Sequence, residues 1–291
     1  FRGVVWAGYR GVLPDWAQSL KEGQGYQEFF VAEDCLIRFV ELTTPKFLNN
    51  CKPDFMLNLW ENYCPDVEAL FYFDPDVVNK CRWGFYEEWV TEGIALCEDG
   101  YPELAFNHPR RVGWLKFAKS HGYSCQKTLE RVYNAGFIGV KQSQKSVLSL
   151  WQKLLETSEA AGHLSLSKAH FDERPKGLHV YPYISDDQDT LNLVLMLTSH
   201  PLSTYGPEGM DFGRPGSIMS HAAGGGVTKA WRKPMLRKAL GGVPPTLTDK
   251  LYYKHAQAPI QLYSRSQFLQ KKLALRCSAA IGRFIHRSLG G

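Results

Sequence analysis

Apolar residues fall along the chain into short runs and into segments with helical spacing. The runs predict strands at residues 1–7, 29–32, 36–42, 70–73, 93–97 and 132–140. The helical spacing predicts helices at residues 54–63, 146–156 and 188–197. Residues 199–226 are rich in Gly, Pro and Ser, which predicts irregular chain with one short strand near 217–220. Alternation of this kind predicts a layered α/β domain.

The predicted strand at 70–73 ends abruptly in two carboxylates, Asp74 and Asp76, separated only by Pro75. The carboxyl end of a strand is where open α/β sheets bind ligands. Two hard oxygen donors held this close suit Mg²⁺ or Mn²⁺ bridging a diphosphate. The plainer alternative is a solvated turn that happens to contain two Asp residues.

Composition limits the architecture and the compartment. A chain of 291 residues with 44% hydrophobic residues can bury the core of one large domain, with or without an appended subdomain. Its seven cysteines are scattered and never form a Cys-x-x-Cys pair, so neither a disulfide framework nor a zinc site is indicated. We find no signal peptide pattern and no apolar run of membrane-spanning length, and we expect a cytoplasmic protein.

The net charge of +5 is unevenly distributed, because eight Lys and Arg residues and no acid follow Asp249. Within 268–289 these cations alternate with apolar residues at near-helical spacing, which predicts an amphipathic basic helix. We therefore divide the chain into a main domain, 1–240, and a basic, partly helical C-terminal extension, 241–291. Residues 265–291 are expected either to lie on the inner membrane face or to pack on the domain with a solvated basic face. Nucleic acid is not an expected partner, because the rest of the chain is slightly acidic.

Three further segments hold small or polar residues that a simple core does not require. Residues 134–136 (Asn-Ala-Gly) interrupt an apolar strand, which indicates a close approach to the backbone or a bulge. Residues 186–189 (Asp-Asp-Gln-Asp) open a predicted helix, where acids also serve as ordinary caps. The third segment contains His221, a glycine run at 224–226 and Lys229. It can supply a metal ligand together with backbone amides and a cation for a diphosphate. The plainer alternative is a structural His followed by a flexible turn.

Taken in this order, the four sites resemble the metal-dependent nucleotide-sugar glycosyltransferases of the GT-A fold, most of all retaining glycosyltransferase family 8 and its relatives. That family has a strand-ending Asp-x-Asp, then Asn-Ala-Gly, then Asp-Gln-Asp, then a His, Gly, Lys and Trp series. The resemblance covers roughly residues 1–231. It implies a mixed central sheet flanked by helices, and transfer of a sugar from a UDP-sugar or similar donor to a glycan or lipid-linked acceptor.

Position by position, the resemblance implies a role for each matching residue. The implied ligands of Mn²⁺ or Mg²⁺ are Asp74, Asp76 and His221. The residues implied to bind the donor are Lys52, Asn134, Ala135, Gly136, Gly224, Gly225 and Lys229. The residues implied to lie beside the reacting sugar carbon are Asp187, Gln188 and Asp189. The glycine run is longer than in the family and Ala230 stands where the family has Pro, so Lys233 is an alternative to Lys229 for the phosphate contact.

Two other function classes stay open. A sugar-nucleotide-forming nucleotidyltransferase usually carries a glycine-rich basic loop after its first strand, and residues 8–11 (Gly-Tyr-Arg-Gly) resemble that loop only slightly. A non-catalytic protein that binds a sugar or a membrane surface would have no need of the acids and His221. Retention of the anomeric configuration is implied by the resemblance alone.

Overall fold

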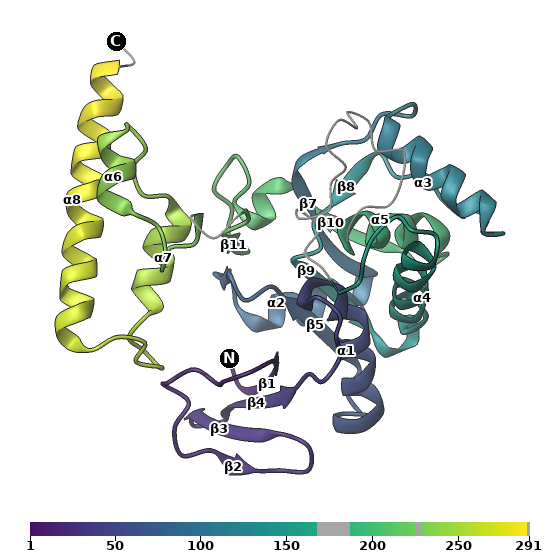
Figure 1. Cartoon of the computed structure of the whole chain (residues 1–291), viewed down its shortest axis with the longest axis horizontal. Helices are drawn as coiled ribbons and strands as arrows, with labels where there is room; N and C mark the ends of the chain where they lie inside the picture. Colours follow the sequence, from purple (N-terminus) through teal and green to yellow (C-terminus); the bar gives the residue numbers. More distant parts are fainter. Residues whose placement is uncertain (168–186, 225–227, 290–291) are drawn as a thin grey trace. The chain divides into compact units, whose positions relative to one another are not determined.

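The computed structural model describes residues 1–167, 187–224 and 228–289 (Figure 1). The chain forms two compact units. Unit 1 consists of Phe1–Thr43, Asp76–Lys80 and Ile218–Gly291, and unit 2 of Thr44–Pro75 and Cys81–Ser217. In this division the C-terminal residues group with the N-terminal 43 residues, and the boundary expected at residue 240 stays a prediction.

Unit 2 contains a mixed sheet in the strand order β10-β7-β9-β5, with β8 paired to β7. The strands are β5 (Ala69–Phe73), β7 (Ile94–Glu103), β8 (Arg131–Tyr133), β9 (Phe137–Lys141) and β10 (Leu202–Tyr205). Only β10 and β7 pair in parallel; β5, β8 and β9 make antiparallel pairs. The mixed sheet expected for the α/β class is therefore present in this unit.

Helices cover both faces of this sheet. Side chains alternate along β5, so that Leu70 and Tyr72 pack on the main core, whereas Phe71 and Phe73 contact aromatic residues of α2 (Trp83–Trp89). The main core is built with α1 (Lys52–Asn58), α3 (Pro109–Ser120), α4 (Ser146–Ala160) and α5 (Asp187–Leu197). A short π-helix, Leu59–Tyr63, continues α1. The aromatic side chains after the Asp-x-Asp pair thus belong mainly to the core.

Unit 1 contains two further sheets. Its N-terminal sheet has the order β1-β4-β3-β2, formed by β1 (Gly3–Tyr9), β2 (Lys21–Glu22), β3 (Gln27–Ala32) and β4 (Cys35–Glu41). A two-stranded sheet pairs β6 (Val77–Asn79) with β11 (Met219–His221). The helices are α6 (Met235–Leu240), α7 (Leu247–His255) and α8 (Arg265–Leu289). Within the described residues, none of the helices has the length and apolar content needed to cross a bilayer.

Most predicted elements are present, with shifted ends. The strands expected at 29–32, 36–42, 70–73 and 132–140 and the helices expected at 54–63, 146–156 and 188–197 match described elements. The first strand begins at Gly3 rather than Phe1 and extends to Tyr9. The first strand, however, pairs with β4 in a sheet separate from the mixed sheet of unit 2. Periodicity identifies a strand but not its partner.

The packing of α4 on the unit 2 core can be tested with Leu154, which is completely buried. Truncation to Ala leaves a cavity, so Leu154→Ala should lower the free energy of unfolding by about 2–5 kcal/mol. Urea denaturation followed by circular dichroism measures this change. The matched control is Leu240→Ala, because Leu240 is 65% exposed on α6 and should change stability by less than about 0.5 kcal/mol. Equal losses in the two variants would contradict the described packing.

Candidate functional site

The candidate site in unit 2 is organised around the buried ammonium group of Lys52, the first residue of α1. Its side chain is 3% exposed and contacts Asp187 Oδ2 at 2.8 Å and Asp74 Oδ1 at 3.3 Å. It also donates to the carbonyl of Ala135 at 2.9 Å. Burial lowers the pKa of Lys52, but the two carboxylates outweigh burial and raise that pKa, so the group stays charged. One cation therefore joins the starts of α1 and α5, the end of β5 and the turn before β9.

The Asn-Ala-Gly segment is a tight turn between β8 and β9. Asn134 accepts a hydrogen bond from the Gly136 amide at 2.9 Å through its own side chain, as Asn does in Asx turns. The Gly136 carbonyl accepts from the Asp74 amide at 2.8 Å, which extends the pairing of β5 with β9 by one step. The turn is therefore fixed to the first acid of the Asp-x-Asp pair.

Gln188 is oriented by a residue that the sequence did not single out, Asp99 on β7. Asp99 Oδ2 accepts from Gln188 Nε2 at 2.8 Å and from Asn134 Nδ2 at 3.0 Å. Gln188 Oε1 in turn accepts from the Ala135 amide at 3.2 Å. A carboxylate accepts hydrogen bonds only, so it selects the amide nitrogen of Gln188 and leaves the amide oxygen facing the 134–136 turn.

Two further polar contacts hold the start of α5. Asp189 Oδ1 lies 2.9 Å from Arg110 Nη2, at the start of α3. Asn192, one turn along α5, accepts from the Tyr133 amide at 2.8 Å and donates to the Tyr133 carbonyl at 2.9 Å. Asn192 is completely buried within an otherwise apolar helix segment, and this is the sequence signal that could have marked it. The acid expected before Asp187, Asp186, lies outside the described residues.

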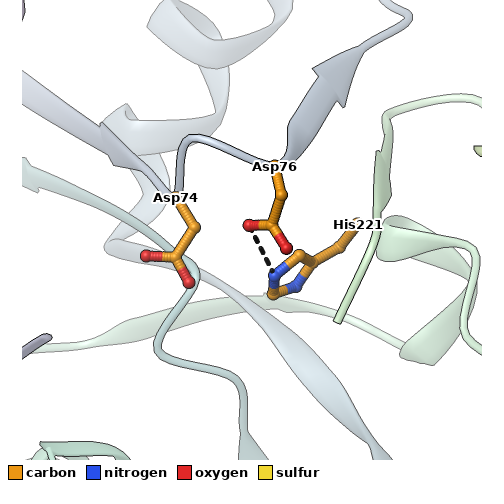
Figure 2. Close-up of side chains that lie close together, drawn as sticks. All are labelled: Asp74, Asp76 and His221. Atoms are coloured by element: carbon orange, nitrogen blue, oxygen red, sulfur yellow. Dashed lines mark ion pairs between the residues drawn. The ribbon is translucent and has the colours of Figure 1, made fainter. Parts of the chain in front are cut away.

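Asp74, Asp76 and His221 form the candidate metal site (Figure 2). Each offers one ligand atom, and these atoms lie within 4.8 Å of one another. Only Pro75 separates Asp74 from Asp76, so the covalent chain itself keeps the two acids close. His221 is paired with Val77 in the β11–β6 ladder, and its Nε2 lies 3.3 Å from Asp76 Oδ1. The three residues singled out as metal ligands are thus brought together.

Lys229 contacts the second oxygen of Asp76 and donates to the Ala222 carbonyl at 2.7 Å. Burial alone would raise the pKa of Asp76, but His221 and Lys229 beside it lower that pKa to about 2. Lys233, the alternative phosphate ligand, instead forms a 2.6 Å ion pair with buried Asp249. Gly224 has a φ of +106°, which favours glycine, and Gly225 lies outside the described residues.

Comparison with known proteins adds no assignment: no protein-family model matches the chain, and no curated protein matches it at significant similarity. The functional argument therefore depends on the sequence motifs and on the geometry of the described residues.

The Lys52 network makes a prediction about stability. Lys52→Met removes the cation and leaves the buried Asp187 and the half-buried Asp74 with one less neutralising partner, so the free energy of unfolding should fall by about 3–5 kcal/mol. Chemical denaturation at neutral pH measures the loss.

Lys145→Met is the matched control for this experiment. Lys145 forms a 3.0 Å pair with Glu61, but both partners are substantially exposed. Breaking an exposed pair should change stability by no more than about 1 kcal/mol. A loss for Lys52→Met as small as that of the control would contradict the central role of Lys52.

Proposed function

We propose that this chain is a divalent-metal-dependent glycosyltransferase that transfers a sugar, with retention, from a nucleotide-diphosphate donor such as a UDP-sugar to a hydroxyl acceptor. The observation that carries the proposal is the convergence of Asp74, Asp76 and His221 on one small region. The second acid of the pair is also contacted by Lys229, a cation suited to a phosphate. Residues that can bind a metal ion are therefore in contact with a cation that can bind a diphosphate.

The chemistry of the donor set fits a divalent cation. Two carboxylate oxygens and one imidazole nitrogen are ligands that Mn²⁺ accepts in proteins, and they leave coordination positions for phosphate oxygens. A cation bound there would supply Lewis-acid stabilisation of the leaving diphosphate. Asp76 is 9% exposed and already surrounded by two cationic or hydrogen-bonding partners, so its carboxylate is held ionised for ligation.

We assign the stabilisation of the reacting sugar to the start of α5, within unit 2. Cleavage of the bond between sugar and diphosphate develops positive charge at the anomeric carbon, which is stabilised by nearby oxygens. Asp99 and the Ala135 amide hold Gln188 in one orientation, and Arg110 holds Asp189. We assign to Gln188 and Asp189 the contact with the reacting sugar. To Asp187, which is engaged by Lys52, we assign the orientation of this helix start.

Ligand binding tests the donor and the metal together. The protein with Mn²⁺ and a UDP-sugar should melt several degrees higher than the protein alone, because saturating ligand stabilises by about 3 kcal/mol at a hundred times Kd. Differential scanning fluorimetry with UDP- and GDP-sugars, with and without Mn²⁺, measures this. Stabilisation by a nucleoside triphosphate and Mg²⁺ instead would favour nucleotidyl transfer. Sugar binding without any need for metal would favour a non-catalytic protein.

The metal ligands are tested by Asp76→Asn and His221→Ala. Both variants should fold but lose the Mn²⁺-dependent part of the melting shift and nearly all sugar transfer, because each removes one ligand. Asp66→Asn and His255→Ala are matched controls, since Asp66 and His255 are exposed and are not among the proposed ligands. Unchanged transfer in Asp76→Asn with Mn²⁺ would overturn the metal assignment.

Asp99 is tested as a positioning residue. Asp99→Asn replaces the acceptor of two hydrogen bonds with an amide, so Gln188 loses its fixed orientation and kcat should fall about ten- to a hundredfold. The affinity for Mn²⁺ should change little, because Asp99 is not among the proposed ligands. Glu103→Gln, on the same strand and 78% exposed in its side chain, is the control. A fall in metal affinity instead of kcat would show that Asp99 acts elsewhere.

A further inference from the structure

Helix α8, the longest of the helices in the described part of the chain, presents an exposed apolar stripe that the proposed transferase chemistry does not use. Helix α8 packs along α6, which lies on one side of it in Figure 1. On the packed face, Ser278 is buried and Gly282 lies so close to Pro244 that an added Cβ would meet it at 2.7 Å. Phe268 and Leu275, on the same face, pack against a small cluster that includes Tyr253. This face fixes the rotation of α8 about its axis.

The opposite face of α8 consists of Leu269, Leu273, Cys277, Ala280 and Phe284, here called the outer stripe. These residues recur at intervals of four, four, three and four, so they share one side of the helix. All five are exposed, and the exposed fractions of the three largest are 58% for Leu269, 63% for Leu273 and 77% for Phe284. Large apolar side chains aligned at such exposure indicate a surface that contacts an apolar partner.

Cations follow one edge of the outer stripe. Arg265, Lys272, Arg276 and Arg283 are exposed and lie within about one residue's rotation of the stripe. No acid follows Asp249 in the sequence, so α8 itself carries none. Its packing partner α6 has no acid either, and the one acid of α7, Asp249, is buried and paired with Lys233. The charge beside the stripe is therefore uncompensated by the helices of this unit.

We propose that the outer stripe of α8 and its flanking cations dock this protein on an anionic lipid bilayer, with the helix lying in the plane of the interface. Apolar side chains enter the boundary between headgroups and acyl chains, while Lys and Arg beside them attract anionic headgroups. A nucleic acid would use the cations but would gain little from exposed leucines. A second protein copy would bury the leucines but would bring the same unbalanced positive charge against its own.

Vesicle sedimentation tests the proposal with the full chain. The wild-type protein should pellet with vesicles of phosphatidylcholine containing about one third phosphatidylglycerol, should bind pure phosphatidylcholine vesicles at least tenfold more weakly, and should be released by high salt. Neither result depends on metal or donor, so failure here leaves the proposed transferase activity standing, and loss of that activity leaves this proposal standing. Absence of pelleting with anionic vesicles would overturn the proposal.

Two sets of variants separate the apolar and the electrostatic contributions. The triple variant Leu269→Gln, Leu273→Gln and Phe284→Gln should weaken binding to anionic vesicles by roughly a hundredfold or more, because it removes three apolar side chains that would enter the bilayer. Lys272→Gln with Arg276→Gln and Arg283→Gln should weaken it by about a hundredfold, at roughly fivefold for each cation. All six positions are at least partly solvated, so the variants should keep the wild-type melting temperature.

Matched controls use exposed residues of other elements. Val12→Gln with Phe106→Gln removes apolar residues that are 95% and 83% exposed, and Lys21→Gln with Lys116→Gln and Lys119→Gln removes three exposed cations. These controls should bind vesicles like the wild type. Losses in the controls equal to those in the α8 variants would overturn the assignment to α8. A wild-type dimer that the apolar α8 variant dissociates, together with no vesicle binding, would replace the bilayer with a second copy of the chain.

Discussion

The buried ammonium of Lys52 is the interaction on which the arrangement of the candidate residues within unit 2 depends. An isolated charge in a protein interior is costly, and Lys52 is tolerated only because two carboxylates and a carbonyl surround it. Those three groups come from β5, the turn before β9 and the start of α5. Satisfying a single cation therefore sets the positions of segments that are remote in sequence. Gln188 and Asp189 come directly after Asp187 in the sequence, so the ion pair between Lys52 and Asp187 also determines where they lie.

The candidate metal site follows two other constraints, the chain connectivity of the two acids and the register of the β6–β11 ladder. The two acids are separated by one residue, and His221 is set opposite Val77 by the register of a two-stranded ladder. A shift of one residue in that ladder would turn the imidazole to the other face. The Ala222 amide also donates to the Asp76 carbonyl at 3.1 Å, which continues the ladder beyond His221. The arrangement of Asp76 and His221 therefore depends on the register of this ladder.

The sequence predicts the parts of this site that lie next to a strong periodic signal. Asp74 and Asp76 follow a fully apolar strand, and Gln188 lies at the start of a long apolar helix, so both could be located before any coordinates. Asp99 and Arg110 could not, because single charged residues near a strand and a helix start carry no information about what they will approach through space. The separate sheet of residues 1–43 was missed for a similar reason: alternation predicts its strands, whereas their pairing depends on contacts with distant segments. Helix α3 mixes cations with apolar residues too irregularly for its periodicity to be recognised.

The most direct test of the account is a crystal structure of the protein soaked with Mn²⁺ and UDP, with anomalous diffraction recorded for manganese. The account predicts one manganese ion bound by carboxylate oxygens of Asp74 and Asp76 and by Nε2 of His221, with both phosphates of UDP on the ion and Lys229 moved from Asp76 to a phosphate oxygen. Manganese bound at other residues, or UDP bound with no ion beside it, would contradict the account.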